Sequence, residues 1–236
     1  MAPFGASRAG LMSVAADDIP DSAIYRYPFA ERSDDTLVEE IQGENGTAVE
    51  LTNVTGNWTE NHAERGDGTN YGSLVAFSET EFSGPFSLEF SFESTDDSDK
   101  RIGGVKEGSQ RIVLRIREGN LAIQTSDIDN ESIIVETTES FATGSQKHIV
   151  IGWDDFVDAD TYDIYVDTVE NSNVAFDQSP SAGNLTDYTE PFFTHAKNDD
   201  GSKLDGIDAD IGFWQFHDER LSQSQVDDLY NSLPWT

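Results

Sequence analysis

An all-β fold, in which two antiparallel sheets are closed by one short helix, is predicted for this chain of 236 residues. Two observations predict it. Apolar residues recur with a period of two over many short segments, and Gly, Asn, Asp and Ser separate these segments, which is the pattern of half-buried strands. A clear helix signal occurs only near the C-terminus. Many strands with almost no helix are typical of a β-sandwich.

The last strand and the helix after it carry the strongest local signals. The strand buries one face, on which four apolar positions alternate with polar ones or Gly: Ile207, Ala209, Ile211 and Phe213. Ser222 and Gln225 have the spacing of a capping box, and Leu221 and Val226 have that of a hydrophobic staple. We therefore expect a helix that begins at Ser222 and packs its apolar face back onto the sheet.

The remaining strands follow from the same periodicity. In chain order they cover residues 24–29, 48–53, 74–77, 86–92, 111–117, 121–125, 133–135, 148–153 and 162–166. The segment 86–92 (FSLEFSF) places all its Phe and Leu residues on one face, which we expect in the core. Two stretches rich in Gly, Asn and Asp are predicted as long loops: residues 55–72 and 171–206.

Residues 111–117 (RIVLRIR) form an unusual amphipathic strand. Its aliphatic residues at 112, 114 and 116 point inward, and its arginines point outward: Arg111, Arg115 and Arg117. One interpretation is that these arginines neutralise acids on neighbouring strands, because opposite charges across strands are modestly stabilising. The alternative is a contact surface for an acidic subunit or a sugar acid.

The charge balance is extreme. There are 46 Asp and Glu against 14 Lys and Arg, which gives a formal net charge of -32. Such a charge opposes the compact state by self-repulsion in dilute buffer, whereas at about 1 M salt the Debye length falls to about 3 Å and the repulsion is screened. The composition therefore predicts a protein from a halophile. It argues against nucleic acid as a partner, because that binding needs cations that neutralise phosphates.

Other classes are also excluded by what the sequence lacks. There is no cysteine, so disulfides and thiolate metal sites are excluded. No apolar run is long enough to span a bilayer, and the first twenty residues do not have the pattern of a secretory signal peptide. We expect no membrane partner. If the protein acts outside the cell, it would have to leave by a route other than a signal peptide, such as assembly into a particle that is released by lysis.

Residues 1–22 are interpreted as an N-terminal docking arm, and residues 23–236 as the folded domain. Residues 1–16 contain no acid and one cation, so their apolar side chains could lie against an acidic neighbour without repulsion. A flexible terminus is the alternative. The residues expected to contact a partner are Phe4, Arg8, Leu11 and Met12 in the arm, together with Arg111, Arg115 and Arg117.

Six segments follow one another in this chain order: AIYRYPF, GPFSLEFSF, VLRIREGNLAIQT, QKHIVIGWD, YDIYVD and IDADIGFWQFHDERLSQSQVDDLY. Their order resembles that of concanavalin A-like domains, and of laminin-G-like domains in particular. The resemblance implies a jelly-roll sandwich of two antiparallel sheets. The N-terminal PFGASRAGLMSV, with the DIPDS that follows, is similar to the starts of structural proteins of tailed viruses of halophilic archaea.

Catalysis is not expected. Some jelly rolls of this class are glycoside hydrolases, one family of which carries Glu-x-Asp-x-x-Glu on a strand, but the comparable place here reads GIDADIG and contains no Glu. Asp208 and Asp210 are therefore interpreted as solvated or ion-binding carboxylates. The histidines show no metal spacing, and neither a nucleophile elbow nor a phosphate loop occurs.

Two kinds of ligand site are considered. Calcium prefers several oxygens on flexible loops, and five aspartates gather within a dozen residues: Asp199, Asp200, Asp205, Asp208 and Asp210. Hydration of an acidic loop is the alternative there. Aromatic rings that could stack on sugars are Trp58, Tyr71 and Trp214, for which burial in the core is the alternative.

Two functions follow as hypotheses. The first is a virion structural protein, a capsid decoration or a tail component. It would assemble as a symmetric homo-oligomer with other virion proteins and contact host-surface glycans. The second is a cellular laminin-G-like carbohydrate-binding module at the surface of a halophilic archaeon.

Overall fold

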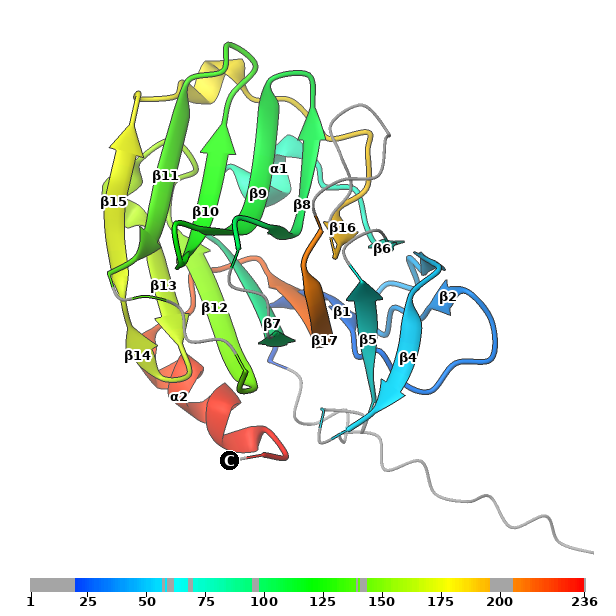
Figure 1. Ribbon diagram of the computed structural model, residues 1–236. Coiled ribbons are helices and arrows are strands. Elements are labelled where there is room, and N and C mark those ends of the chain that lie inside the picture. Colours follow the sequence, from blue (N-terminus) through cyan, green and yellow to red (C-terminus); the bar gives the residue numbers. More distant parts are fainter. Residues whose placement is uncertain are drawn as a thin grey trace, which may run out of the picture.

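The computed structural model describes residues 20–56, 58, 62–67, 70–94, 98–138, 140, 144–195 and 206–235. Over these residues the chain forms two antiparallel sheets that pack face to face, with a short helix at the C-terminal end (Figure 1). The predicted all-β jelly-roll sandwich with a C-terminal helix is confirmed. Within the described residues, no helix is long and apolar enough to cross a membrane. The predicted docking arm lies almost entirely outside them.

The first sheet has the order β14–β13–β12–β7–β17–β5–β4, and β1 also pairs with β17. Its strands are β1 (Ala23–Tyr27), β4 (Thr52–Thr55), β5 (His62–Asp67), β7 (Phe86–Ser94), β12 (Lys147–Trp153), β13 (Asp163–Val166), β14 (Val169–Glu170) and β17 (Asp208–His217).

The second sheet has the order β15–β11–β10–β9–β8–β16–β6–β3–β2. Its strands are β2 (Thr36–Leu37), β3 (Gly46–Val49), β6 (Tyr71–Ser73), β8 (Arg101–Glu107), β9 (Gln110–Arg117), β10 (Asn120–Ser126), β11 (Ser132–Thr137), β15 (Ser172–Asp177) and β16 (Phe193–Thr194). The helices are α1 (Glu79–Phe82), α2 (Gln223–Ser232) and the short 3-10 helices η2 (Ala159–Thr161) and η3 (Ala182–Asn184).

The core lies between the sheets and is rich in aromatic rings. The predicted Phe and Leu face of β7 is confirmed, because its inward side chains are at most 1% exposed. Phe90 stacks on Trp214 with ring centroids 4.4 Å apart, and Phe86 stacks on Trp153 at 5.2 Å. Such rings bury large apolar areas and dominate the energetics of a core.

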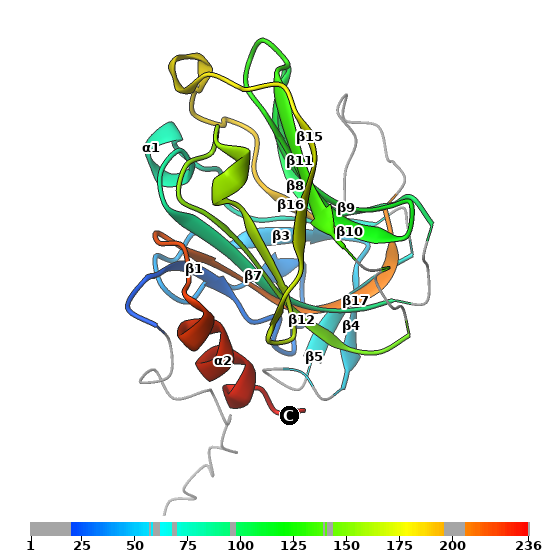
Figure 2. The same ribbon diagram turned by 90° about the vertical axis from the view of Figure 1, so that its left-hand side faces the viewer.

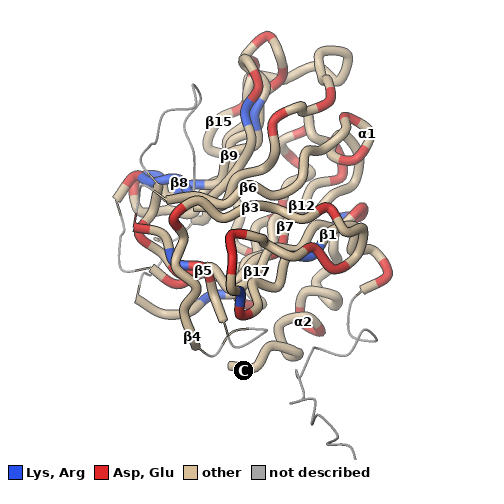
Figure 3. Tube along the Cα trace, turned by 90° about the vertical axis from the view of Figure 1, so that its right-hand side faces the viewer, with Lys and Arg blue, Asp and Glu red and all other residues tan. Residues whose placement is uncertain are grey.

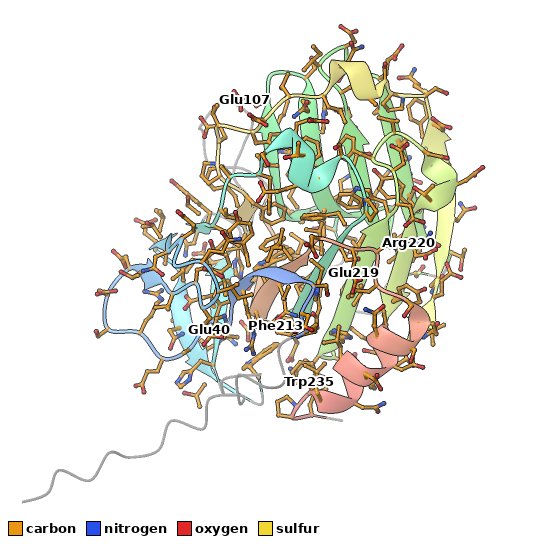
Figure 4. All side chains as sticks on the ribbon, turned by 180° about the vertical axis from the view of Figure 1, so that it is seen from behind. Glu40, Glu107, Phe213, Glu219, Arg220 and Trp235 are labelled. Carbon is orange, nitrogen blue, oxygen red and sulfur yellow. The ribbon has the colours of Figure 1, made fainter. Side chains whose placement is uncertain are left out.

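Strand β17 organises the first sheet, as its pattern predicts, but its alternation is interrupted. β7 pairs along one edge, while β5 and β1 share the other. The register shifts between Ile211 and Phe213. The prediction that Phe213 shares the core face of Ile211 is therefore wrong: Trp214 enters the core, and Phe213 lies on the outer side (Figure 4). A Cβ on Gly212 would lie 2.4 Å from both Ser91 Oγ and Trp58 Cε3, so only glycine fits this bulge.

The predicted capped helix is confirmed. Ser222 is the N-cap of α2, and its backbone N–H donates to Gln225 Oε1 at 2.8 Å. Leu221 and Val226 pack together with Val150 and Tyr165 of the first sheet. Helix α2 therefore covers the outer face of this sheet, next to β12 and β13 (Figure 2).

Several boundaries differ from the prediction. β5 and the start of β6 lie in the predicted loop 55–72, and β15 and β16 lie in the predicted loop 171–206. Residues 74–77, predicted as a strand, are irregular, although the Leu74 N–H donates to the carbonyl oxygen of Phe192 and the carbonyl oxygen of Val75 accepts from the Phe192 N–H. The reason is clearest in β5, whose sequence HAERGD is polar although Glu64 is 0% exposed. Arg32 neutralises Glu64 with Nε–Oε1 2.8 Å and Nη2–Oε2 2.9 Å, and this pairing is invisible to a local pattern.

Candidate binding face

The outer face of the β8–β9 hairpin collects positive charge, and we call it the basic face. It carries five of the chain's 14 cations, namely Arg101, Lys106, Arg111, Arg115 and Arg117. As predicted, the aliphatic residues of β9 point into the core, so its arginines lie outside. Figure 3 shows these cations as blue segments along β8 and β9, while red segments are spread over many elements of the molecule.

Like charges face each other across these two strands. Arg101 is the register partner of Arg115, and Lys106 is that of Arg111. A register shift follows Arg101, at the step to Gly103. Like charges directly opposite each other in a sheet are destabilising.

Arg111 and Arg117 have partners close by. Arg117 Nη1 lies 2.8 Å from Glu136 Oε2 on β11, so the neutralisation interpretation holds for this residue. Arg111 donates from Nε to Ser126 Oγ at 3.0 Å and from Nη2 to Asn130 Oδ1 at 2.5 Å, so its partners are neutral oxygens.

Arg115 differs from both. Its Nε is buried without a hydrogen-bond partner, and no ion pair or hydrogen bond joins its guanidinium to any described residue. The residue as a whole remains partly exposed. Burial, and next the charge of Arg117, lower the pKa of Arg115 from its ordinary value. Arginine nevertheless keeps its charge in proteins, so an ionic donor is left unsatisfied here.

Arginines elsewhere in the described chain bind carboxylates. Arg65 contacts Asp210 with both Nε and Nη2, each at 2.6 Å. Arg220, labelled in Figure 4, bridges Asp154 and Asp163. Acids are thus available to arginines throughout this fold. Arg115 makes no such contact with a described residue, although the charge of Asp99 acts on it.

Of the three aromatic candidates for glycan stacking, two are buried. Trp214 is 0% exposed and lies in the core, so it offers no ring face to a ligand. Trp58 is 3% exposed and packs edge-on against Trp235, with ring centroids 6.3 Å apart. Only Tyr71 is partly exposed, and its ring contacts Phe193 at 5.6 Å. The structure does not bring these rings together.

The acidic candidates for calcium are only partly described. Asp199, Asp200 and Asp205 lie outside the described residues. Asp208 is exposed at the start of β17, opposite Asp67, while the carboxylate of Asp210 is held by Arg65. Among the described residues, no group of three or more His, Asp or Glu is placed to hold a metal ion. The calcium site stays a prediction. The arm residues Phe4, Arg8, Leu11 and Met12 also lie outside the described part.

A buried ionic cluster was not predicted from the sequence. Glu89, on the outer side of β7, lies beneath other side chains and is 2% exposed. Its Oε1 is 2.8 Å from His148 Nε2, and its Oε2 is 3.1 Å from both His217 Nε2 and Gln215 Nε2. His148 Nδ1 is buried and has no partner in this structure. The sequence did contain a signal for this cluster. Glu89 lies near the centre of β7 and shares a face of the strand with Ser87 and Ser91, which marks that face as polar.

The electrostatics of this cluster favour an ionised carboxylate. Burial alone would raise the pKa of Glu89, but the hydrogen bonds and charges of His148 and His217 outweigh it and lower that pKa to about 2. Glu89 is therefore a buried carboxylate that depends on its two histidines. This cluster is enclosed by the fold, so we assign it to stability.

Known proteins resemble this chain in structure only. No protein-family profile matches, and no characterised relative is found by sequence. Domain 4 of AbnA, an extracellular arabinanase from Geobacillus stearothermophilus solved with arabinotriose, superposes with a TM-score of 0.64 at 16% identity, over 89% of this chain and 98% of that domain. The binding domain of Paraclostridial Mosquitocidal Protein 1 superposes with a TM-score of 0.66 at 16% identity, over 90% of this chain.

A third similar structure is a mutant of Trypanosoma rangeli sialidase that displays trans-sialidase activity, with a TM-score of 0.59 at 11% identity and 89% of this chain covered. This chain spans 52% of the toxin binding domain and 32% of the sialidase. At these identities the comparisons establish the fold, a β-sandwich that occurs in proteins of different activities, and function has to be argued from the residues.

Proposed function

We propose that this chain is a non-catalytic binding module that recognises acidic glycans through the basic face. The observation that carries the proposal is the concentration of five cations on two adjacent strands of a chain whose net charge is -32. A local positive patch on a rigid sheet attracts anions and orients them, even when the whole molecule is negative. By analogy of fold, the structural neighbour solved with arabinotriose supports the binding of an oligosaccharide, and the preference for acidic sugars is argued from the basic face alone.

We further propose that the module is a structural component of a virion, on the capsid or the tail of a tailed virus of halophilic archaea. Residues 1–22 would dock it, it would form a homo-oligomer next to other virion proteins, and the displayed face would reach host-surface glycans. The support for this part is the acidic composition and the N-terminal sequence. A carbohydrate-binding module at the cell surface of a halophile is the second candidate.

A panel of immobilised polysaccharides tests the proposed function. In about 1 M KCl, where long-range repulsion is screened, we expect retention on polygalacturonate and alginate but not on neutral arabinan or dextran. Changing Arg101, Arg111 and Arg117 together to Glu should weaken retention by at least about tenfold. Changing Arg65 to Glu, outside the basic face, should not. Equal retention on neutral glycans, or none on acidic ones, would contradict the proposal.

Deleting residues 1–20 separates binding from assembly in the same panel. A virion component should keep its fold and its glycan retention but lose its oligomers, as measured by light scattering. A cellular module should stay an unchanged monomer that still binds. If the deletion variant folds but is no longer retained on acidic glycans, the binding residues lie in residues 1–20. That result would overturn the proposed role of the basic face.

A further inference from the structure

Strand β15 ends the second sheet, and among the described strands only β11 pairs with it. Every residue from Asn173 to Asp177 on this strand is exposed. An edge strand presents a row of unpaired backbone N–H and C=O groups, on which a segment of another chain can add as a further strand. Strand β14 ends the first sheet on the same side of the sandwich (Figure 1).

Exposed apolar side chains gather on these two strands. Six large apolar side chains are exposed in the described chain, and three of them are Val169 on β14 and Val174 and Phe176 on β15, which are 63%, 40% and 41% exposed. Ile134, the cross-strand partner of Phe176, is also partly exposed. We call these four residues the β15 edge. Apolar side chains that are exposed together mark an interaction site, whereas scattered single ones do not.

The β15 edge is also acidic. Residues 148–196 contain ten acids and no Lys or Arg. Glu170 precedes β15, and Asp177 is its last residue. Their carboxylates accept hydrogen bonds from the N–H groups of Ser172 and Ser179, and neither carboxylate forms an ion pair with a described residue. The partner that fits this surface is therefore an apolar segment without acids.

Residues 1–16, in the docking arm, have this chemistry. They contain no acid and one cation, Arg8, together with the apolar residues Phe4, Leu11 and Met12. Deepening the assembly part of the proposed function, on which it rests, we infer that residues 1–16 of a second copy of this chain dock along the β15 edge as an added strand. Backbone hydrogen bonds supply the affinity in this mode of recognition, and side chains supply the specificity.

A second β15 fits this edge less well than the docking arm does. The register with β11 shifts at Ala175, which is left without a partner, and such a bulge bends the strand. Bulges of this kind hinder edge-to-edge pairing of two folded sheets. A segment that contains Gly5 and Gly10 can follow the bend, and it brings no acid to an acidic edge.

The docking arm of the same chain is less well placed than that of a second copy. The arm joins the fold at β1, which pairs with β17. In the first sheet β7, β12 and β13 lie between β17 and β14, and α2 covers the outer face next to β12 and β13. An arm that reached β15 of its own chain would have to pass around this helix.

Photo-cross-linking of the full chain tests the inference. Phe4 is replaced by the photoreactive benzoylphenylalanine, and chains with and without heavy nitrogen are diluted together and reconcentrated in about 1 M KCl. We expect cross-links between heavy and light chains that join position 4 to residues 169–177, as identified by mass spectrometry. Cross-links confined to other segments would overturn the docking surface. Cross-links within single chains alone would overturn the second copy as the occupant.

Variants of β15 give a second test, which does not depend on cross-linking. Phe176→Glu places an acid on the β15 edge and should weaken self-association by at least about tenfold, as measured by light scattering against concentration. Phe4→Glu in the docking arm should do the same. The control Val38→Glu adds the same charge at an apolar side chain that is 55% exposed elsewhere, and should leave association unchanged. Equal weakening by the control would overturn the inference.

The outcomes separate this inference from the proposed function. If deleting residues 1–20 abolishes the oligomers but Phe176→Glu does not, the docking arm binds elsewhere and only the inference fails. If Phe176→Glu abolishes them but the deletion does not, β15 pairs with a second β15, and the inference again fails alone. A chain that stays monomeric at every concentration contradicts the proposed homo-oligomer as well. Retention on acidic glycans, assigned to the basic face, should be equal in all these variants.

Discussion

Replacing Glu89 by glutamine is expected to lower the free energy of unfolding near neutral pH by about 3 kcal/mol. The change keeps the shape of the side chain but removes the charge that holds His148 and His217, both of which are 0% exposed. Two buried imidazoles would then lose their ionic partner. Denaturant unfolding in about 2 M KCl, where surface repulsion is screened, measures the effect. The control is Glu131→Gln, a change of equal charge at an exposed position, which should cost less than about 0.5 kcal/mol.

The pH dependence of this difference is fixed by the lowered pKa of Glu89. A carboxyl whose pKa is lower in the folded state stabilises the fold above its unfolded value near 4.5, and this contribution is lost as the pH falls toward about 2. The gap between wild type and Glu89→Gln should therefore be constant above about pH 5 and shrink between pH 4.5 and 2. A gap that grows on acidification would contradict the ionised cluster.

Lowering the salt concentration is expected to unfold the protein below about 1 M, because screening is then lost. With 46 acids against 14 cations, the compact state holds the net negative charge in a much smaller volume than the unfolded chain does. The melting temperature should rise steeply between about 0.1 M and 1 M KCl, as the Debye length falls from about 10 Å to about 3 Å. An equal osmolality of sucrose serves as the control, since it stabilises without screening. A melting temperature that does not change with salt would contradict the halophilic interpretation.

Features with a local cause could be predicted from the sequence. The Ser222 capping box, the aromatic face of β7 and the hairpin at β9 each depend on residues a few positions apart. These local features correctly predicted the all-β class and the C-terminal helix.

Features that depend on distant partners could not be predicted. β5 looks like a loop because its buried Glu64 is neutralised by Arg32, thirty-two positions away. Phe213 was placed on the wrong face because close packing of Trp58 against Gly212 accompanies a register shift, which no alternation pattern contains.

Some features of the candidate site could likewise be predicted from the sequence, and others could not. The outward arginines of β9 follow from alternation, and so does their use as a candidate contact surface. Which of them binds a carboxylate depends on the order of strands: Glu136 on β11 reaches Arg117, while the register places Arg101 and the small Ala122 on either side of Arg115. The burial of Trp58 and Trp214 likewise needed the sheet order.

The central claim is that acidic sugars bind on the outer face of β8 and β9. The most direct measurement is an NMR titration of arginine Nε–Hε signals with tetragalacturonate in about 1 M KCl. We predict that arginine signals of the basic face shift in a saturable way, while those of Arg32, Arg65 and Arg220, which lie outside it, stay in place. Saturable binding that leaves every signal of the basic face unmoved, with shifts confined to other parts of the chain, would contradict the account.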